Sequence, residues 1–412
     1  MNRITFIMPS FNRAGYIAEA IDSVLGQMAD DDDLVIVDDG STDNTEAVVA
    51  PYCGRLRYVR QENSGKSVAL NRGLAMTRSR YVWICDDDDL LLPDAVETLV
   101  NAIEDSNADM AFGRYTRFRI DDGQRIDLGT GYWPDLSEGT ANRHILEDAF
   151  AMHNGSLVRR ERYERLGPFD PEMLRSQDYE MFVRIALSSR ITYVDRDIFL
   201  QRKHSGDRGP AAISHKAGRS DTVWEQFDRM IFVRMLDRVP VSFFTSMFDS
   251  PDQGLCQRAG LLQRACILAR HGMWERAIAD CTSATDSAGD RPLHPLEIAI
   301  CRRMTAGKHG FGNMLTEQIA RALRDLTSAN RTGGAIAAEI LRGLFWRLRG
   351  ETRAERIAAI RVLARPASIF SLASRYLTSS PSGPQQELRE TVPDLAITQA
   401  AMREWKADIS GA

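Results

Sequence analysis

Short β-type runs alternate with amphipathic stretches along the first hundred residues. Four runs have strand character, at residues 4–8, 34–37, 56–59 and 81–85. After the first of these runs, the apolar residues Ile17, Ile21 and Val24 recur at the spacing of one helix face. Four repeats of strand, turn and helix predict an open, mostly parallel sheet with helices on both faces, an α/β fold.

The pattern changes further along the chain. Residues of about 110–210 mix β-type runs with a helical stretch at residues 179–187. From about residue 215 onward, helical stretches rich in Ala, Arg and Leu are separated by Gly, Pro and Ser, with little strand signal. We therefore expect a Rossmann-like α/β domain over residues 1–214 and an all-helical C-terminal domain over residues 215–412.

Composition and charge are those of an ordinary globular protein. The chain has 412 residues, 43% hydrophobic and 26% charged, which allows a real core and excludes disordered and collagen-like classes. Its 52 Lys and Arg and 57 Asp and Glu residues give a formal charge of −5. This balance does not favour nucleic acid as a partner.

The six cysteines are scattered, without a CxxC pair or a Cys/His spacing that suits zinc, and we interpret them as reduced core thiols. The chain enters its first β-type run directly after Met1, without the apolar segment and cleavage site of a signal peptide. It has no run of about 18 apolar residues that would predict a membrane-spanning helix. We therefore expect a cytoplasmic location.

Polar loops follow three of the predicted strands. The first strand ends in residues 9–12, the second in Asp38 and Asp39, and the fourth in the aspartate run 86–89. Ligands of open α/β sheets bind beyond the carboxyl ends of the strands. These three loops could therefore converge on one cleft.

The aspartate run is the strongest local signal. Four adjacent carboxylates repel one another, so one loop accommodates them only with a cation or in a solvated, hydrogen-bonded setting. A hard divalent ion, Mn²⁺ or Mg²⁺, binds through one or two carboxylates together with substrate phosphates, which indicates a nucleotide diphosphate. The alternative is a solvated acidic turn before the helix that starts after Pro93. For a second acidic run, residues 30–33, the solvated loop is the preferred interpretation.

Seven motifs of the first half of the chain carry a resemblance to a known family. In chain order they are Pro9-Ser10-Phe11-Asn12, Val37-Asp38-Asp39-Gly40-Ser41-Thr42-Asp43, Asn63-Ser64-Gly65-Lys66 with Asn71-Arg72-Gly73, Asp86-Asp87-Asp88-Asp89 with Pro93, Leu166-Gly167-Pro168-Phe169-Asp170, Gln177-Asp178-Tyr179-Glu180-Met181-Phe182-Val183-Arg184 and Arg202-Lys203-His204-Ser205-Gly206. In this order and spacing the chain resembles the family 2 glycosyltransferases over about residues 1–210. Each motif alone is weak, but seven in register are specific. The helical remainder is not covered.

The resemblance implies a GT-A fold and a nucleotide-diphosphate sugar donor, with a UDP-sugar as the first expectation. The enzyme would transfer a hexosyl or N-acetylhexosaminyl group to a glycan, lipid-linked or protein acceptor in bacterial glycan, polysaccharide or glycoconjugate synthesis. Among the donor-binding residues, Phe11 would pack on the nucleobase with Pro9 and Asn12 in the same loop, and Asp38 or Asp39 would accept hydrogen bonds from the base or ribose. The alternative for Phe11 is a core aromatic.

The resemblance also assigns roles around the aspartate run, where the family pattern is Asp-x-Asp-Asp. Lys66 would contact the base or a phosphate and Asn71 would support the nucleotide loop. Asp86 would face the ribose, with Asp87 also on the donor side. Asp88 would hold a divalent metal, Mn²⁺ or Mg²⁺, that bridges the two phosphates and acts as a Lewis acid for the leaving nucleotide diphosphate.

Three further residues complete the implied site. Asp178 would be the general base that deprotonates the acceptor hydroxyl, and attack without a covalent intermediate would invert the anomeric centre. Gln177 departs from the Glu that relatives often have there, which leaves the base in place but removes a neighbouring charge. His204 would contact the metal or the diphosphate, and Asp89 would have a supporting or acceptor-side role. The alternatives are helix capping for Asp178 and a structural role for His204.

Two other functions fit parts of the pattern. A nucleotidyltransferase also uses a Rossmann-like sheet with metal-binding aspartates, but it usually has a Gly-rich basic loop near the first strand, where this chain has residues 9–12. A catalytically inactive nucleotide-sugar-binding protein would have lost the base or the metal aspartates, and this chain retains both.

The C-terminal half contains a basic segment. Residues 335–375 hold eight arginines and three glutamates, a local charge of +5, and Leu341, Leu344 and Leu348 recur at helical spacing with Trp346 nearby. The preferred interpretation is a helix that packs on its own domain or on a second subunit in a homo-oligomer. The alternative is a basic amphipathic surface that makes peripheral contact with anionic lipid at the inner face of the membrane.

Overall fold

The computed structural model describes residues 2–204, 220–289, 291–308, 311, 314, 316–349, 357 and 387–411. Its contacts divide the chain into two units. The sheet unit comprises Met1–Leu136, Phe150–Phe227 and Gln399–Ala412, and the helical unit comprises Ser137–Ala149 and Asp228–Thr398. The domain boundary predicted after residue 214 lies outside the described residues.

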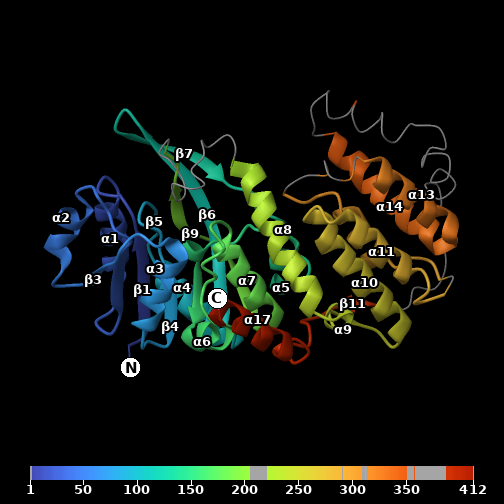
Figure 1. Cartoon of the computed structure of the whole chain (residues 1–412), viewed down its shortest axis with the longest axis horizontal. Helices are drawn as coiled ribbons and strands as arrows, with labels where there is room; N and C mark the ends of the chain where they lie inside the picture. The colour runs from blue at the N-terminus through green and yellow to red at the C-terminus, as the bar shows by residue number, and fades with distance from the viewer. Residues whose placement is uncertain are drawn as a thin grey trace. The chain divides into compact units, whose positions relative to one another are not determined.

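The sheet unit is built around one mixed sheet (Figure 1). The strand order is β3-β2-β1-β4-β8-β6-β9-β5, with β7 paired to β6. The strands are β1 (Ile4–Ser10), β2 (Asp33–Asp38), β3 (Arg57–Arg60), β4 (Tyr81–Ile84), β5 (Leu90–Leu91), β6 (Met110–Asp121), β7 (Gln124–Thr130), β8 (Ser156–Arg159) and β9 (Ile191–Arg202). The pairs β3-β2, β2-β1, β1-β4 and β6-β9 are parallel, and β8, β5 and β7 pair antiparallel with their neighbours. The predicted α/β architecture with a mostly parallel sheet is confirmed.

Helices connect the strands of this unit. They are α1 (Ile17–Leu25), α2 (Thr45–Val49), α3 (Lys66–Ala75), α4 (Ala95–Ser106), α6 (Arg160–Leu166), α7 (Gln177–Ser188) and the C-terminal α17 (Gln399–Gly411), with short 3-10 turns at Ala50–Tyr52 and His153–Gly155. The predicted apolar face of α1 is buried, as the spacing of Ile17, Ile21 and Val24 requires. On α3, Gly73 lies against Ile7 of β1 so closely that a Cβ atom would collide with the Ile7 side chain. This close approach fixes α3 on the sheet.

The register of the parallel strands brings their carboxyl ends to one edge. Ser10 of β1 pairs with Asp38 of β2, which pairs in turn with Arg60 of β3. On the other side of β1, Ile7 pairs with Ile84, the last residue of β4. The loops that follow β1, β2 and β4 therefore start from the same edge of the sheet, as the sequence predicted.

The predicted helical C-terminal region is confirmed, and a two-residue antiparallel strand pair is added to it. Its elements are α5 (Ala141–Glu147), α9 (Val241–Thr245), β10 (Phe248–Asp249), α10 (Gln253–Arg270), α11 (Trp274–Ala284), α12 (Pro295–Arg303), α13 (Glu317–Ala329), α14 (Arg331–Leu348) and β11 (Arg389–Glu390), and α8 (Ser220–Arg238) leads into it. α10 packs beside α11, and α13 packs beside α14 (Figure 1). None of the described helices is both long and apolar enough to cross a bilayer.

Two segments group differently from a simple division at residue 214. Ser137–Ala149, which contains α5, belongs to the helical unit, where Glu147 accepts hydrogen bonds from Arg143 (Nη1–Oε1, 3.2 Å) and Arg303 (Nη2–Oε1, 3.1 Å). Gln399–Ala412 returns to the sheet unit, where Lys406 donates to a backbone carbonyl of α6 (Nζ–O, 2.6 Å). Contacts with residues far away in the sequence, which the chain order does not reveal, decide both memberships.

The basic segment of residues 335–375 is described only as far as residue 349 and at residue 357, and the rest of it lies outside the described residues. Within α14, Leu341, Leu344 and Leu348 are buried in the helical unit, whereas Trp346 is 71% exposed. The apolar face of this helix is therefore used for packing within its own unit.

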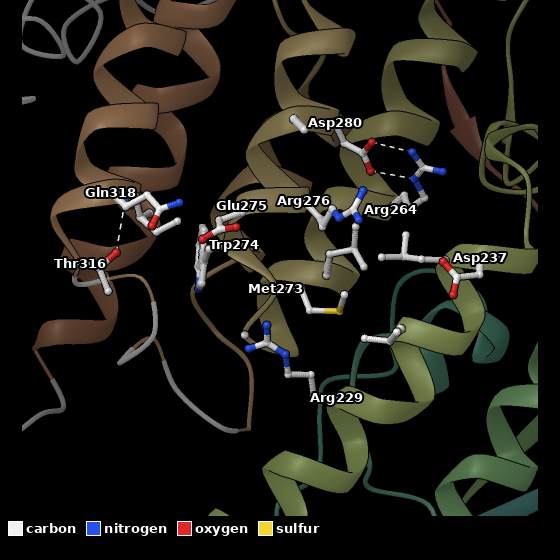
Figure 2. Close-up of a pocket in the computed structure, with 16 residues that line it drawn as sticks. Arg229, Asp237, Arg264, Met273, Trp274, Glu275, Arg276, Asp280, Thr316 and Gln318 are labelled. Atoms are coloured by element: carbon white, nitrogen blue, oxygen red, sulfur yellow. Dashed lines mark hydrogen bonds and ion pairs between the residues drawn. The ribbon is translucent and has the colours of Figure 1, made fainter.

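The helical unit contains a pocket of about 630 Å³ lined by residues of α8, α10, α11 and the start of α13. Figure 2 shows Arg264 and Asp280 joined by two hydrogen bonds on one side of it, with Thr316 and Gln318 on the other. None of the residues predicted to bind donor or metal lines this pocket.

A fully buried ion pair stabilises the helical unit. Arg258 of α10 and Glu297 of α12 form two hydrogen bonds of 2.8 Å, and Arg258 also donates to the carbonyls of Arg291 and Pro292. Arg258→Met is expected to lower the free energy of unfolding by about 3–5 kcal/mol, because it leaves the Glu297 carboxylate buried without its cation. Urea unfolding followed by circular dichroism measures the change.

The exposed pair between Arg389 and Asp249 provides the control. Arg389→Met should leave the unfolding midpoint nearly unchanged, because water and salt screen an exposed pair. Equal destabilisation by the two variants would contradict the importance of the buried pair.

Candidate active site

One buried asparagine forms hydrogen bonds with the aspartate run after β4. The Asn154 side chain donates to Asp86 (Nδ2–Oδ2, 3.2 Å) and to Asp89 (Nδ2–Oδ2, 2.6 Å), and its oxygen accepts the backbone N–H of Asp86. The Asn154 carbonyl accepts the indole N–H of Trp83 in β4 (2.9 Å). Asn154 therefore fixes the two outer carboxylates of the run relative to the sheet.

Two basic side chains approach the same run. The Lys66 ammonium, from the start of α3, lies 2.5 Å from Asp86 Oδ1 and is partly exposed. The Nε atom of Arg13, from the loop after β1, lies 3.4 Å from Asp87 Oδ1 and 3.7 Å from Asp88 Oδ2. The loops after β1 and β4 and the N-terminus of α3 thus meet at the carboxylates.

The end of β9 closes the other side of the run. His204 Nε2 lies 2.9 Å from Asp88 Oδ2, and the His204 ring stacks on Tyr16 with ring centroids 5.1 Å apart. Arg202 donates its backbone N–H to Asp89 Oδ1 (2.7 Å) and its Nε–H to the Asp88 carbonyl (2.9 Å). The predicted metal residues Asp88 and His204 are therefore in direct contact.

Burial and mutual repulsion separate the carboxylates electrostatically. Burial together with the Asp88 charge raises the pKa of Asp87 to about 7. Burial and the neighbouring Asp88 and Asp86 charges raise the pKa of Asp89 well above its usual range. Burial opposes ionisation of Asp88 as well, but its hydrogen bond with His204 and the Arg13 charge outweigh this and lower the pKa of Asp88. Asp88 is thus the carboxylate of the three whose surroundings favour its charged form.

The two aspartates at the end of β2 bind neighbouring loops. Asp38 is fully buried, and its carboxylate accepts the backbone N–H of Ser41 (2.7 Å) and the hydroxyl of Tyr58. Asp39 accepts the backbone N–H of Gly65 (2.8 Å), the residue immediately before α3. Both predicted donor-binding aspartates therefore shape the loops around Lys66, and Asp38 has no exposed surface for a ligand.

The loop after β1 is tied to the loop after β2. Asn12 Oδ1 accepts the backbone N–H of Thr42 (2.8 Å), and the Phe11 N–H donates to Asp87 (N–Oδ2, 3.3 Å). Pro9 is buried within β1, whereas the Phe11 side chain is 42% exposed. The alternative of a core aromatic at Phe11 is therefore wrong.

The motifs at residues 166–170 and 177–184 contribute contacts that hold the helices around the site in place. Asn71 of α3 clamps the backbone of Phe169, accepting its N–H (2.7 Å) and donating to its carbonyl (2.9 Å). Arg184 of α7, fully buried, pairs with Glu180 (2.6 Å) and donates to the Pro168 carbonyl (2.9 Å). These contacts hold α3, the 166–170 loop and α7 together.

Asp178 lies at the N-terminus of α7 and is half-buried. Its Oδ1 accepts the backbone N–H of Tyr179 (2.9 Å). The helix starts after Ser176, a non-glycine residue in the left-handed region (φ 55°). Burial lowers the pKa of Lys66, but the charges of Asp86 and Asp178 outweigh this effect and raise the pKa above its usual value. The predicted base thus lies on the same side of the unit as the aspartate run.

Sequence reasoning missed Asn154, Arg13 and Arg202. Arg202 stands inside a motif that the sequence singled out and Arg13 directly follows another, but their roles depend on contacts with residues more than 70 positions away. Asn154 follows His153 shortly before β8, so the sequence signal for Asn154 was a pair of polar residues next to a buried strand. Among the described residues, no group of three or more His, Cys, Asp or Glu side chains is arranged to hold a metal alone.

Comparison with known proteins shows what the chain is similar to. Residues 5–167 match the family model described as Glycosyl transferase family 2. An uncharacterized glycosyltransferase of Rickettsia felis is 27% identical over 291 residues, which cover 65% of this chain and 44% of that protein. Poly(ribitol-phosphate) beta-N-acetylglucosaminyltransferase TarP of Staphylococcus aureus is 40% identical over 121 residues, which cover 28% of this chain and 37% of TarP.

Among solved structures, S. aureus TarS 1-349 in complex with UDP-GlcNAc aligns with a TM-score of 0.49 at 16% identity, over 85% of this chain and 93% of that chain. The chain spans less than half the length of the two curated relatives above. The family match covers β1 through α6, which includes the aspartate run and its clamp Asn154. Over residues 5–167, the chain is similar to glycosyl transferase family 2.

Proposed function

We propose that this protein is an inverting glycosyltransferase that moves a sugar from a nucleotide-diphosphate donor to an acceptor hydroxyl. The observation that carries the proposal is the aspartate run of a family 2 domain, held by Asn154 and surrounded by Lys66, Arg13 and His204. Carboxylates mixed with cationic side chains at the carboxyl ends of parallel strands suit a ligand that carries both hydroxyls and phosphates.

The donor is proposed to be a UDP-sugar. Lys66 and Arg13 would contact the diphosphate, and Asp86, which already accepts from Lys66, would face the ribose. The exposed ring of Phe11 would pack on the base. Asp38 and Asp39 would act by shaping the loops that receive the nucleotide, since their carboxylates already accept hydrogen bonds from the protein.

The donor set fits a divalent metal, Mn²⁺ or Mg²⁺. Asp88 supplies an ionised oxygen and His204 a nitrogen in contact with it, and two protein ligands together with substrate phosphates are a usual arrangement for such an ion. Burial and repulsion within the run together raise the pKa of Asp87, and a cation offsets both of these costs of ionisation. When bound, the metal would supply a Lewis acid for the departing nucleotide diphosphate.

Asp178 is proposed as the general base, because a half-buried carboxylate at a helix N-terminus on the side of the aspartate run can take the proton of an acceptor hydroxyl. The acceptor would be a glycan, lipid-linked or protein hydroxyl of a bacterial cell. We place the reaction in the cytoplasm.

A panel of UDP-, GDP- and dTDP-sugars tests the function. We expect a UDP-sugar to raise the Tm of the protein in the presence of Mn²⁺ and to be hydrolysed slowly without acceptor, with UDP-GlcNAc tested first because TarP is named as an N-acetylglucosaminyltransferase. The control is the same panel without metal. A Tm shift with no hydrolysis or transfer would indicate a binding protein, and release of pyrophosphate from UTP and a sugar phosphate would indicate a nucleotidyltransferase.

A further inference from the structure

A buried histidine near the proposed base has no assigned role. His153 is 3% exposed, and neither of its ring nitrogens has a hydrogen-bond partner among the described residues. Its neighbour Asn154, by contrast, uses its whole side chain to hold the aspartate run. A buried polar atom without a hydrogen-bond partner is costly, so two of them on one ring call for a functional explanation.

Aromatic contacts aim the ring of His153 at one face of α7. It meets Phe182 edge-on, with ring centroids 4.8 Å apart and planes at 89°, and meets Phe169 in the same way at 5.4 Å and 82°. Phe182 follows Asp178 by four residues, so both side chains project from the same face of α7. His153 therefore packs one turn away from the proposed base.

Charged groups face His153 from three elements, Asp178 on α7, Lys66 on α3 and Asp86 after β4. Burial lowers the pKa of His153 to about 4, even though the Asp178 charge opposes this. The ring is consequently neutral at pH 7 and has one N–H donor and one acceptor nitrogen. Among the described residues, the Asp178 carboxylate accepts only the backbone N–H of Tyr179, so it has room for a further donor.

We propose that His153 positions Asp178 during transfer by donating a ring N–H to one oxygen of its carboxylate, which leaves the other oxygen to take the proton of the acceptor hydroxyl. The inference rests on the proposed function, because it supplies a partner for the base of that reaction. His153 touches neither sugar in this arrangement and is a positioning residue. The hydrogen bond favours the ionised carboxylate, the form that a base requires.

The pH dependence of kcat/KM in three variants tests the inference. His153→Phe keeps the edge contacts with Phe169 and Phe182 but has no N–H, so Asp178 should hold its proton to higher pH. The acid limb should move up by at least about half a pH unit, and transfer at neutral pH should fall about 10-fold, the expected effect of one charge-assisted hydrogen bond. His153→Gln and His153→Asn carry an amide N–H near the two ring positions, and one of them should restore the acid limb.

His271→Phe is the matched control, because His271 is a buried histidine stacked on Phe232 in the helical unit (centroids 3.7 Å apart). It should leave the acid limb unchanged. An acid limb that stays in place in all three His153 variants, while the wild-type protein transfers sugar, overturns the inference and leaves the proposed function standing.

Absence of wild-type transfer from every donor would count against the proposed function alone. The inference about His153 is then tested by a measurement that needs no turnover. The ¹⁵N chemical shifts of the His153 ring are compared between the wild-type protein and Asp178→Asn. A change on substitution supports contact between the two side chains, and identical shifts overturn it.

Discussion

Asp88→Asn is expected to reduce sugar transfer by at least about 100-fold while the sheet unit stays folded. A metal at a leaving diphosphate contributes several kcal/mol of charge stabilisation, and asparagine keeps the shape of Asp88 but not its charge. The same substitution removes one of the two main causes that raise the pKa of Asp87, namely the Asp88 charge. The Tm should therefore be unchanged or higher, which separates lost activity from lost structure.

Initial transfer rates with EDTA and with added Mn²⁺, together with the Tm, measure this effect. The wild-type rate should fall with EDTA and return with Mn²⁺, whereas the Asp88→Asn rate should stay low throughout. Asp31→Asn, at an exposed position of the acidic run 30–33, makes the same change of charge and should have no effect on transfer. The Asp88–His204 contact has only a structural role if Asp88→Asn transfers sugar at a rate within a few-fold of wild type. The same conclusion follows if EDTA leaves the wild-type rate unchanged.

The parallel half of the fold could be predicted because each of its elements is a local pattern. Residues 34–37 form an apolar run and are buried in β2, and the helical spacing of Ile17, Ile21 and Val24 matches the buried face of α1. A buried strand next to an amphipathic helix needs no distant partner to leave its mark on the sequence.

The mixed half depends on pairings that no local pattern encodes. All residues of β7 are exposed, so its sequence shows no buried face and its existence depends on pairing with β6. β8 enters the sheet between β4 and β6 by pairing Val158 with Val82, 76 residues earlier. α5 likewise belongs to the helical unit through distant contacts, among them the ion pair of Arg143 with Glu390.

The candidate site likewise contains residues that the sequence reveals and residues that only the tertiary structure reveals. Four adjacent aspartates after a strand can be recognised from the sequence alone, because their carboxylates repel one another in any fold. Asn154 is a single asparagine among many, and only the tertiary structure shows that it reaches both Asp86 and Asp89. Asp38 presents the opposite case, since its position after β2 suggested a ligand contact while its carboxylate is enclosed by Ser41 and Tyr58.

Asp178→Asn is the second substitution with a large expected effect. Transfer should fall about 10²- to 10⁴-fold, because asparagine cannot take the proton of the acceptor hydroxyl. An amide oxygen can still accept the Tyr179 N–H that Oδ1 accepts in the wild-type protein, so the start of α7 should keep its geometry. Nucleotide binding, measured by calorimetry with UDP and Mn²⁺, should stay within a few-fold of wild type.

Asp109→Asn separates loss of the base from loss of a structural carboxylate. Asp109 accepts the backbone N–H of Arg190 (2.8 Å) and pairs with Arg162 (3.1 Å), away from the aspartate run. Its substitution should lower the Tm and leave kcat unchanged, whereas Asp178→Asn should lower kcat and leave the Tm unchanged. If Asp178→Asn transfers sugar at a rate close to that of wild type, another group takes the proton, and the role of Asp178 is reduced to capping α7.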